Sequence, residues 1–194
     1  MAYYDDIYTV AAGNYGIFTR ADAQALGISD KELSRIASGK RLRRIGHGVY
    51  KLTRYVPGPN DHFAEAVAIV GKGAYLYGFS VLALFELAPI ASDKIFVASP
   101  RRVRRRLPEN LELVKVDDTA SAAGWPTRYE RIPSQTVAEA IRVCANEMTK
   151  DQLADTVSIA RAKGILTAGE ERALLDGDRT GNRTGDRDSS APLV

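Results

Sequence analysis

The sequence predicts an α+β protein with two folded units and a C-terminal tail, and three observations predict it. Residues 1–55 carry helical periodicity followed by two short strand-like runs. A seam rich in proline and glycine follows, and mixed helical and strand patterns then continue through 56–175. Residues 176–194 contain three glycines, seven charged residues and very few apolar ones, so we expect a disordered tail.

Capping signals divide the first unit into three helices. We expect a helix over 3–13, a second over 20–26 that begins at Thr19, and a third that begins at Ser29 and ends near Gly39. The expected buried faces are Ile7, Val10 and Ala11 in the first helix, Ala21, Ala25 and Leu26 in the second, and Leu33, Ile36 and Ala37 in the third.

The second and third helices are joined by a tight turn, which is the pattern of a helix-turn-helix. Two strand-like runs follow, 42–45 and 49–52, with Gly46-His47-Gly48 between them. A hairpin directly after the third helix is typical of a wing. The first unit is therefore predicted to be a winged helix-turn-helix.

Charge is distributed unevenly along the chain, although the net charge is only +3. Residues 29–54 hold eight basic residues against two acidic ones, and residues 101–106 hold five arginines in six positions. The segment 107–175 is acidic, with eleven acidic residues against eight basic ones. Two basic segments on a nearly neutral chain indicate a polyanionic partner.

The third helix and the wing supply the candidate DNA contacts. Lys31, Ser34 and Arg35 are predicted to face outward for base readout in the major groove, with Arg35 suited to guanine. The expected contacts to phosphates or to the minor groove are Ser38, Lys40, Arg41, Arg43, Arg44 and His47. The alternative interpretations are an ordinary solvated basic face and a protein-interaction surface.

The arginine run is predicted to be a loop between two strands. We expect it to make a second contact to nucleic acid, either DNA backbone or an RNA, because like charges in a loop repel one another unless an anion is present. The residues concerned are Arg101, Arg102, Arg104, Arg105 and Arg106. The alternative is a solvated hairpin loop that the acidic surface neutralises.

The second unit reads as a mixture of helices and strands. Helices are expected after Asn60, over 80–87, after Pro133-Ser134, over 150–163 and over 167–175. Strands are expected over 94–98, 111–116 and 127–132. Cys144 falls on the apolar stripe of the helix that follows Pro133-Ser134, so we interpret it as a buried core residue and not as a reactive thiol.

Several functional classes find no support in the sequence. No apolar stretch is long enough to span a membrane, and residues 1–9 lack the features of a secretory signal, so a cytoplasmic protein is expected. One cysteine and two histidines leave little material for a disulfide or a metal centre, and no cofactor is expected. Phosphate-binding loops and common hydrolase motifs are not found.

A metal-dependent enzyme acting on nucleic acid is the second functional hypothesis. Its ligands would be Glu112, Asp117 and Asp118. Glu112 and Lys115 lie three residues apart on one predicted strand and so point to opposite faces, which is unlike a nuclease strand. Asp117 and Asp118 are also explained by a turn.

Six segments of the N-terminal unit form a recognisable series: Gly16-Ile17-Phe18-Thr19-Arg20, Ala25-Leu26-Gly27-Ile28-Ser29, Leu33-Ser34-Arg35, Gly39, Leu42-Arg43-Arg44-Ile45 and Gly48-Val49-Tyr50. In this order and spacing they resemble the N-terminal domain of AbiEi-type antitoxins. Three further segments, 77–82, 95–100 and 131–136, resemble the second domain of that family, so the likeness covers roughly 5–145. The arginine run and the tail are not part of the pattern.

This resemblance implies a bacterial repressor and antitoxin without catalytic residues. Such a protein binds inverted repeats of operator DNA and counteracts a nucleotidyltransferase-like toxin, directly or functionally. We expect a monomer or a DNA-induced dimer, because one recognition helix reads only a short half-site. A third hypothesis, a protein-interaction adaptor, predicts a tight toxin complex and no DNA binding.

Overall fold

A computed structural model describes residues 3–88, 92–117 and 127–181 of the chain. Its N-terminal part contains the helices α1 (Tyr4–Ala12), α2 (Arg20–Ala25) and α3 (Asp30–Ser38) and the strands β1 (Ile17–Thr19), β2 (Leu42–Gly46) and β3 (Val49–Leu52). The three strands form an antiparallel sheet in the order β1-β3-β2. The α+β fold class and the helix-turn-helix followed by a hairpin are confirmed.

Both predicted capping signals are present. The Thr19 hydroxyl accepts a hydrogen bond from the backbone N–H of Asp22, and the Asp22 carboxylate accepts one from the N–H of Thr19. Ser29 and Glu32 make the same reciprocal pair at the start of α3. These bonds satisfy backbone donors that a helix end otherwise leaves unpaired.

The predicted buried faces are confirmed for α1 and α3, and only in part for α2. In α2, Ala23 is buried and Ala21 and Ala25 are exposed, contrary to the prediction. Leu26 is half-buried and packs against the apolar cluster, as predicted. A helix of six residues is too short to show its own period, so its orientation follows from the cap at Thr19 and from packing against α3 and β1.

The second unit contains a five-stranded mixed sheet and five helices among the described residues. Its elements are α4 (Asp61–Val70), β4 (Tyr75–Leu76), α5 (Phe79–Leu84), β5 (Ile95–Ser99), β6 (Leu111–Lys115), β7 (Thr127–Tyr129), β8 (Ile132–Ser134), α6 (Val137–Cys144), the 3-10 turn η2 (Ala145–Glu147), α7 (Lys150–Ala162) and α8 (Ala168–Gly181). The strand order is β6-β5-β4-β8-β7.

The strands of this sheet differ from the expectation in two ways. Strand β4 was not predicted, because two apolar residues between glycines give no strand period. The strand expected over 127–132 is a hairpin of β7 and β8, which turns at Glu130 and Arg131 with positive φ at both residues. Such a turn normally uses Asn or Gly, so no local sequence signal marks it.

The chain between β5 and β6 is a crossover and not a hairpin. The two strands are parallel, with Ile95 opposite Leu111 and Ser99 opposite Lys115. Residues 100–110 therefore have to run back along the sheet to its other end. The alternative interpretation of the arginine run as a hairpin loop is therefore wrong, because a hairpin joins antiparallel strands.

The C-terminal helix is longer than expected. Helix α8 continues to Gly181, six residues into the segment 176–194 that we expected to be disordered. The remainder of that segment, 182–194, lies outside the described residues, so the expectation for it is not tested.

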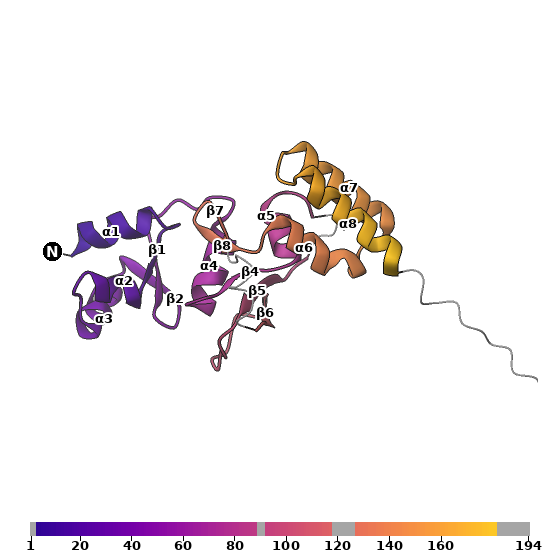
Figure 1. The fold of residues 1–194 in the computed structure, drawn as a ribbon. Helices are drawn as coiled ribbons and strands as arrows, with labels where there is room; N and C mark the ends of the chain where they lie inside the picture. The colour runs from indigo at the N-terminus through magenta and orange to yellow at the C-terminus, as the bar shows by residue number, and fades with distance from the viewer. Residues whose placement is uncertain (1–2, 89–91, 118–126, 182–194) are drawn as a thin grey trace, which may run out of the picture.

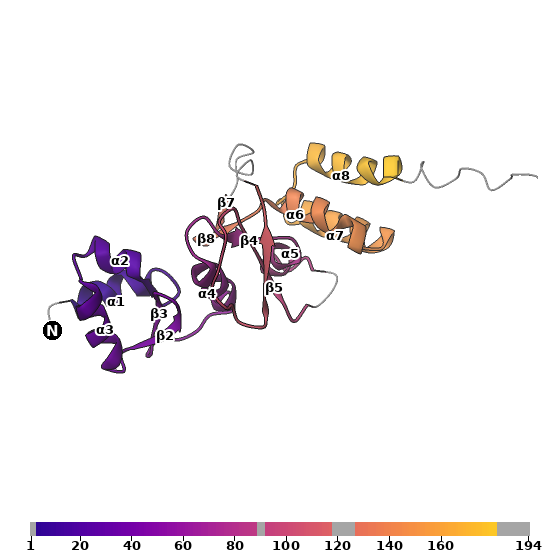
Figure 2. The ribbon, with the colours of Figure 1, turned by 90° about the horizontal axis from the view of Figure 1, so that it is seen from below.

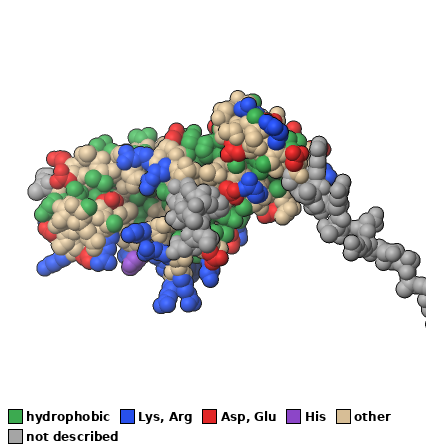
Figure 3. Space-filling model, viewed as in Figure 1, with side chains coloured by type: hydrophobic (Ala, Val, Ile, Leu, Met, Phe, Trp, Pro, Cys, Tyr) green, Lys and Arg blue, Asp and Glu red, His purple; other side chains and the backbone are tan. Residues whose placement is uncertain are grey.

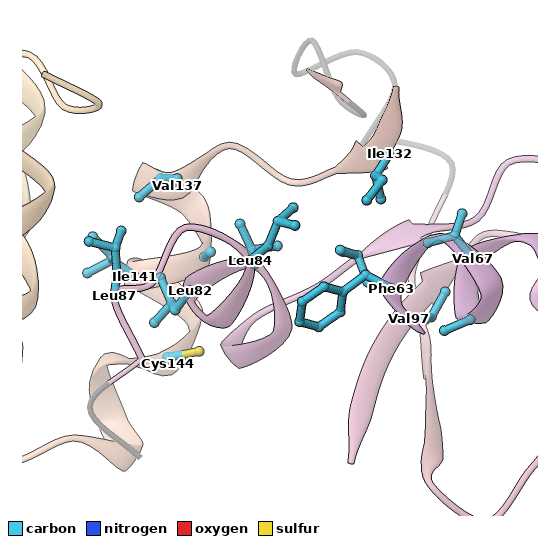
Figure 4. Packing of buried hydrophobic residues seen from close by; sticks show 14 of the residues in the cluster. Phe63, Val67, Leu82, Leu84, Leu87, Val97, Ile132, Val137, Ile141 and Cys144 are labelled. Carbon is cyan, nitrogen blue, oxygen red and sulfur yellow. The ribbon is translucent and has the colours of Figure 1, made fainter. Parts of the chain in front are cut away.

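The largest apolar cluster lies in the second unit (Figure 4). Val137, Ile141 and Cys144 follow one side of α6 and face Leu82 and Leu87. Cys144 is 2% exposed, and burial, with a smaller contribution from the charge of Glu147, raises the pKa of its thiol to about 12. The prediction that Cys144 is a core residue is confirmed.

The molecule is elongated, with its parts arranged in a row (Figures 1 and 2). The helices α1–α3 and their sheet lie at one end, α4 and the five-stranded sheet lie in the middle, and α7 and α8 lie at the other end. Helix α4 lies directly beside the three-stranded sheet in both views, and it is the element that joins the two units.

Candidate nucleic-acid interface

Helix α3 presents its polar residues as one stripe. Lys31, Ser34, Arg35 and Ser38 occupy the spacing i, i+3, i+4 and i+7, which places them on one side of a helix, and all four are exposed. Leu33 is buried on the opposite side, at 2% exposure. The helix is therefore fixed to the core through one face and leaves the predicted base-reading residues accessible.

An ion pair neutralises the acidic residue at the start of α3. Arg20 donates two hydrogen bonds to the carboxylate of Asp30, from Nε to Oδ1 at 2.7 Å and from Nη2 to Oδ2 at 2.5 Å. This bidentate geometry connects the start of α2 with the start of α3. Both side chains are more than half exposed, so the pair adds little stability, but it reduces the negative charge beside the polar stripe.

The end of α3 opens into a basic cleft of about 490 Å³, lined by Tyr4, Gly39, Lys40, Arg41, Thr53 and Arg54. Lys40 has a left-handed backbone, with φ of 62°, and its carbonyl accepts a hydrogen bond from Thr53 Oγ1 at 2.9 Å. The guanidinium of Arg41 lies 4.4 Å from the centroid of the Tyr4 ring.

The sequence reasoning placed Lys40 and Arg41 in this region but missed Tyr4 and Arg54. Both come from other parts of the chain, and their convergence depends on how α1 and β3 pack. Among the described residues that line the cleft, no side chain is acidic, so its chemistry suits a phosphate group.

The wing exposes Arg43, Arg44 and His47. Arg44 is held over the turn, with its Nε donating to the carbonyl of Gly46 at 3.1 Å and its Nη2 3.4 Å from Nδ1 of His47. The turn is attached to α2 by a backbone bond from Arg20 N–H to the Gly48 carbonyl at 2.8 Å. The wing is therefore short and braced.

The arginine crossover, residues 100–110, exposes all five of its arginines to some degree. Val103 and Leu107 pack against the core and anchor the segment. Arg105 differs from the others because its Nη2 donates to the carbonyls of Ile69 and Val70, at 2.6 and 2.7 Å, at the C-terminal end of α4. A cation at that end of a helix is favourable.

The remaining arginines of the crossover are Arg101, Arg102, Arg104 and Arg106. Arg106 lies 3.9 Å from Glu109, but both side chains are more than 90% exposed, so this pair is weak. Four of the five predicted arginines thus project from the crossover, while Arg105 is engaged in holding it.

Three basic segments lie along one edge of the molecule (Figure 3). Lys and Arg side chains follow the lower edge over α3, the wing and the arginine crossover, which forms the lowest projection. Between the wing and the crossover lies a cleft of about 310 Å³, whose lining includes Arg43, Arg44, His62, Glu65 and Asn110. No pattern in the sequence pointed to His62 or Asn110 in this place.

Of the three residues of the metal-dependent hypothesis, the structure describes Glu112 and Asp117, and these two belong to no group of possible metal ligands among the described residues. Glu112 Oε2 lies 2.7 Å from Lys94 Nζ in a surface ion pair, and Asp117 is exposed. Asp118 lies outside the described residues. Within the part of the chain that the structure describes, no three His, Cys, Asp or Glu side chains gather closely enough to hold a metal ion.

Across the described ranges, no helix has the length and apolar character needed to cross a membrane.

Residues 5–53 match a family model described as "Transcriptional regulator, AbiEi antitoxin". The match ends within the loop after β3, so it covers α1 to β3 and confirms the resemblance of the N-terminal unit to an AbiEi-type regulator domain. The resemblance of the second unit stays a prediction. No curated protein sequence matches the chain.

Proposed function

We propose that this protein is an antitoxin-type transcriptional regulator that binds double-stranded operator DNA and represses its own operon. One observation carries the proposal: in a domain that matches an AbiEi regulator model, the third helix and the wing lie on the same basic edge as the arginine crossover. The affinity of a protein for DNA increases with the number of phosphates that its Lys and Arg side chains contact. A continuous basic edge offers several such contacts at once.

Base readout is assigned to α3. Arg35 and Lys31 have the length to reach base edges from a helix in the major groove, and Arg35 can bind guanine through two hydrogen bonds. Ser34 lies between them on the same stripe. The Ser38 hydroxyl donates to the carbonyl of Arg35 at 2.8 Å, so Ser38 contributes more to the end of the helix than to base contacts.

Backbone contacts are assigned to three groups around α3. The cleft with Lys40, Arg41 and Arg54 would hold a phosphate at the end of the helix. Arg43, Arg44 and His47 would contact the backbone or the minor groove from the wing. The exposed arginines of the crossover would hold phosphates further along the duplex. Contacts of this kind add affinity and salt dependence but no sequence information.

We further propose that the protein counteracts a nucleotidyltransferase-like toxin, directly or functionally. A single α3 reads a short half-site, so two copies on an inverted repeat are expected, from a monomer or a DNA-induced dimer. This part of the proposal depends on the family match at 5–53. Growth of cells that express the neighbouring toxin gene, with and without this protein, tests it.

The first experiment is a gel shift on the DNA upstream of the protein's own gene, at two salt concentrations and with nonspecific competitor. We expect a salt-sensitive shift by the wild type and a loss of discrimination by Arg35→Ala. Arg172→Ala is the matched control, because Arg172 is an exposed arginine on α8 at the far end of the molecule. It should bind as the wild type does.

Two other results would contradict the proposal. No specific shift at low salt, together with a stoichiometric toxin complex, would favour the adaptor hypothesis. Cut or extended DNA in the presence of Mg²⁺ or Mn²⁺ would favour the enzyme hypothesis instead.

A further inference from the structure

The three-stranded sheet of the N-terminal unit is buried on both faces. On one face, Phe18 and Leu52 belong to the apolar cluster of α1–α3. On the other face, Ile17 and Val49 belong to the cluster that includes Phe63 and other residues of α4. An antiparallel sheet can leave one face in water, but here α4 covers that face. The DNA-reading unit is thus packed onto the second unit through its sheet.

A buried charge cluster lies in this contact. Lys51 of β3 points to the α4 side, and its Nζ lies 2.5 Å from Asp61 Oδ2 and 2.5 Å from Glu65 Oε1. The exposed fractions of the three side chains are 7%, 7% and 25%. Burial alone would lower the pKa of Lys51, but the hydrogen bonds and charges of Asp61 and Glu65 outweigh burial and raise it.

Asp61 also orders the linker between the two units. Its second carboxylate oxygen, Oδ1, accepts a hydrogen bond from the backbone N–H of Gly58 at 2.9 Å. The carboxylate therefore connects β3 through Lys51, the linker through Gly58 and the first turn of α4. Removal of Lys51 would leave two carboxylates without their shared cation.

A second contact lies on the hairpin of β7 and β8. The hydroxyl of Tyr15 donates to the carbonyl of Glu130 at 2.7 Å, and Asn60 Nδ2 donates to Glu130 Oε2 at 3.0 Å. Tyr15, Glu130 and Arg131 all have positive φ, which is unfavourable for residues with a side chain. Both sides of this contact therefore hold a strained backbone.

Helix α4 thus connects two of the three basic segments, the wing and the arginine crossover. Its first turns hold β3 of the wing through Lys51, and its last carbonyls hold the arginine crossover through Arg105. Helix α4 therefore lies between the wing and the crossover and is bonded to both.

We propose that Lys51 is a positioning residue for DNA binding: its cluster with Asp61 and Glu65 locks the wing onto α4, so that wing and crossover meet the same duplex together. The proposal rests on the proposed function, because it assumes that both segments contact DNA. When the spacing between wing and crossover is fixed, binding of the wing brings the crossover next to the same duplex. The second contact is then intramolecular, and the two weak contacts together give a higher affinity.

The binding test uses the full chain and a labelled duplex of its own upstream DNA. Lys51→Met should weaken binding about 10- to 100-fold, through loss of this intramolecular advantage. Lys94→Met is the matched control, because it removes the same charge from the exposed pair with Glu112. It should bind as the wild type does, and an equal loss in both variants would overturn the proposal.

Covalent rescue separates positioning from a direct contact of Lys51. A Cβ on Gly46 would lie 3.7 Å from Cβ of Ile69, inside the range of about 3.5–4.5 Å for disulfides. Gly46→Cys with Ile69→Cys should therefore tie the wing to α4. In a Lys51→Met background, the oxidised form should regain most of the lost affinity and the reduced form should not. Failure of the oxidised form to regain affinity would contradict a positioning role.

A measurement without DNA tests, independently of the proposed function, whether the cluster of Lys51, Asp61 and Glu65 holds the N-terminal unit on α4. Spin labels at Ala12→Cys and Ser158→Cys, both exposed positions, report the distance between α1 and α7, while buried Cys144 stays unlabelled. The wild type should give one narrow distance distribution and Lys51→Met a broad one. An unchanged distribution would refute the lock, whereas a wild type that binds no DNA would refute only the proposed function.

Misfolding of Lys51→Met would obscure both readouts, so a second variant is needed. Lys51→Met with Asp61→Asn and Glu65→Gln removes all three charges and leaves no buried ion unpaired. The amide introduced by Asp61→Asn would keep an oxygen that can accept the hydrogen bond from Gly58. This triple variant should fold, broaden the distance distribution and bind DNA more weakly than the Lys94→Met control.

Discussion

Helix α3 and the arginine crossover present positive charge in two different ways. In α3, a capped helix fixes each side chain at a known angle, and Leu33 attaches the helix to the core. In the crossover, an irregular segment carries a higher density of arginines and is held by two half-buried apolar residues and by Arg105.

From this difference we expect the two segments to make different kinds of contact with DNA. Base readout requires donors held in a fixed geometry, which a capped helix supplies. Phosphates repeat along the duplex and accept contacts from many directions, so a loop of arginines suffices for them. We therefore expect sequence discrimination to depend on α3 and the salt dependence to be shared by both segments.

Truncation of Leu33 should have the largest effect on stability. Leu33→Ala leaves a cavity under α3, and we expect the free energy of unfolding to fall by about 3 kcal/mol. Val103→Ala, at the half-buried anchor of the crossover, should lower it by only about 1 kcal/mol. Urea unfolding followed by circular dichroism measures both. Equal losses would show that the two segments depend on the core to the same degree.

The same comparison can be made for DNA binding. Arg35→Ala should reduce discrimination between operator and scrambled duplex by about 1–3 kcal/mol. Arg104→Ala should weaken binding to both duplexes alike and lower the slope of log K against log salt by about 1. Fluorescence anisotropy at several salt concentrations measures both quantities. A loss of discrimination in Arg104→Ala would mean that the crossover also reads bases.

The structure predicts different roles for neighbouring arginines of the crossover. Arg105→Ala removes two charge-assisted hydrogen bonds to carbonyls at the end of α4 and should lower the free energy of unfolding by about 1 kcal/mol. Arg104→Ala should change it by less than about 0.5 kcal/mol. Thermal unfolding without DNA compares them, and equal stability would mean that Arg105 is not an anchor.

Local signals in the sequence predicted the elements of the N-terminal unit well. The residue pairs Thr19 with Asp22 and Ser29 with Glu32 fixed two helix starts, because a capping box is determined by residues three apart. The wing followed from strand-like runs around two glycines. All of the candidate contact residues, including Arg35 and His47, are exposed as expected.

Features that depend on long-range packing could not be predicted in this way. Lys51 looked like one more basic residue of the wing, and only the position of α4 shows that it is buried with Asp61 and Glu65. Arg105 was indistinguishable from its neighbours until the end of α4 was known. Both cases involve partners at least ten residues distant in sequence, where periodicity carries no information.

The smallest expected effect concerns the charge of the capping residue of α3. The hydrogen bond from the Ser29 hydroxyl, then that from the Ser29 backbone N–H, holds the pKa of Glu32 below its ordinary value of 4.5. A carboxyl with a lowered pKa in the folded state stabilises the fold above its unfolded pKa, and this contribution is lost as the pH falls through the folded value. Glu32→Gln keeps the acceptor but removes the charge, as in α7, where Gln152 makes the same box with Thr149.

We therefore expect Glu32→Gln to be slightly less stable than the wild type at neutral pH and equally stable once the pH lies below the lowered pKa of Glu32. Urea unfolding under both conditions measures this difference. Glu170→Gln is the matched variant outside the N-terminal unit. Hydrogen bonds from Thr167 lower the pKa of Glu170 in the same way, so its stability should depend on pH in the same direction. Arg104→Ala alters no capping carboxylate, so its stability relative to the wild type should not change between the two conditions. A deficit of Glu32→Gln that persists at the acidic pH would assign its effect to packing and not to the charge.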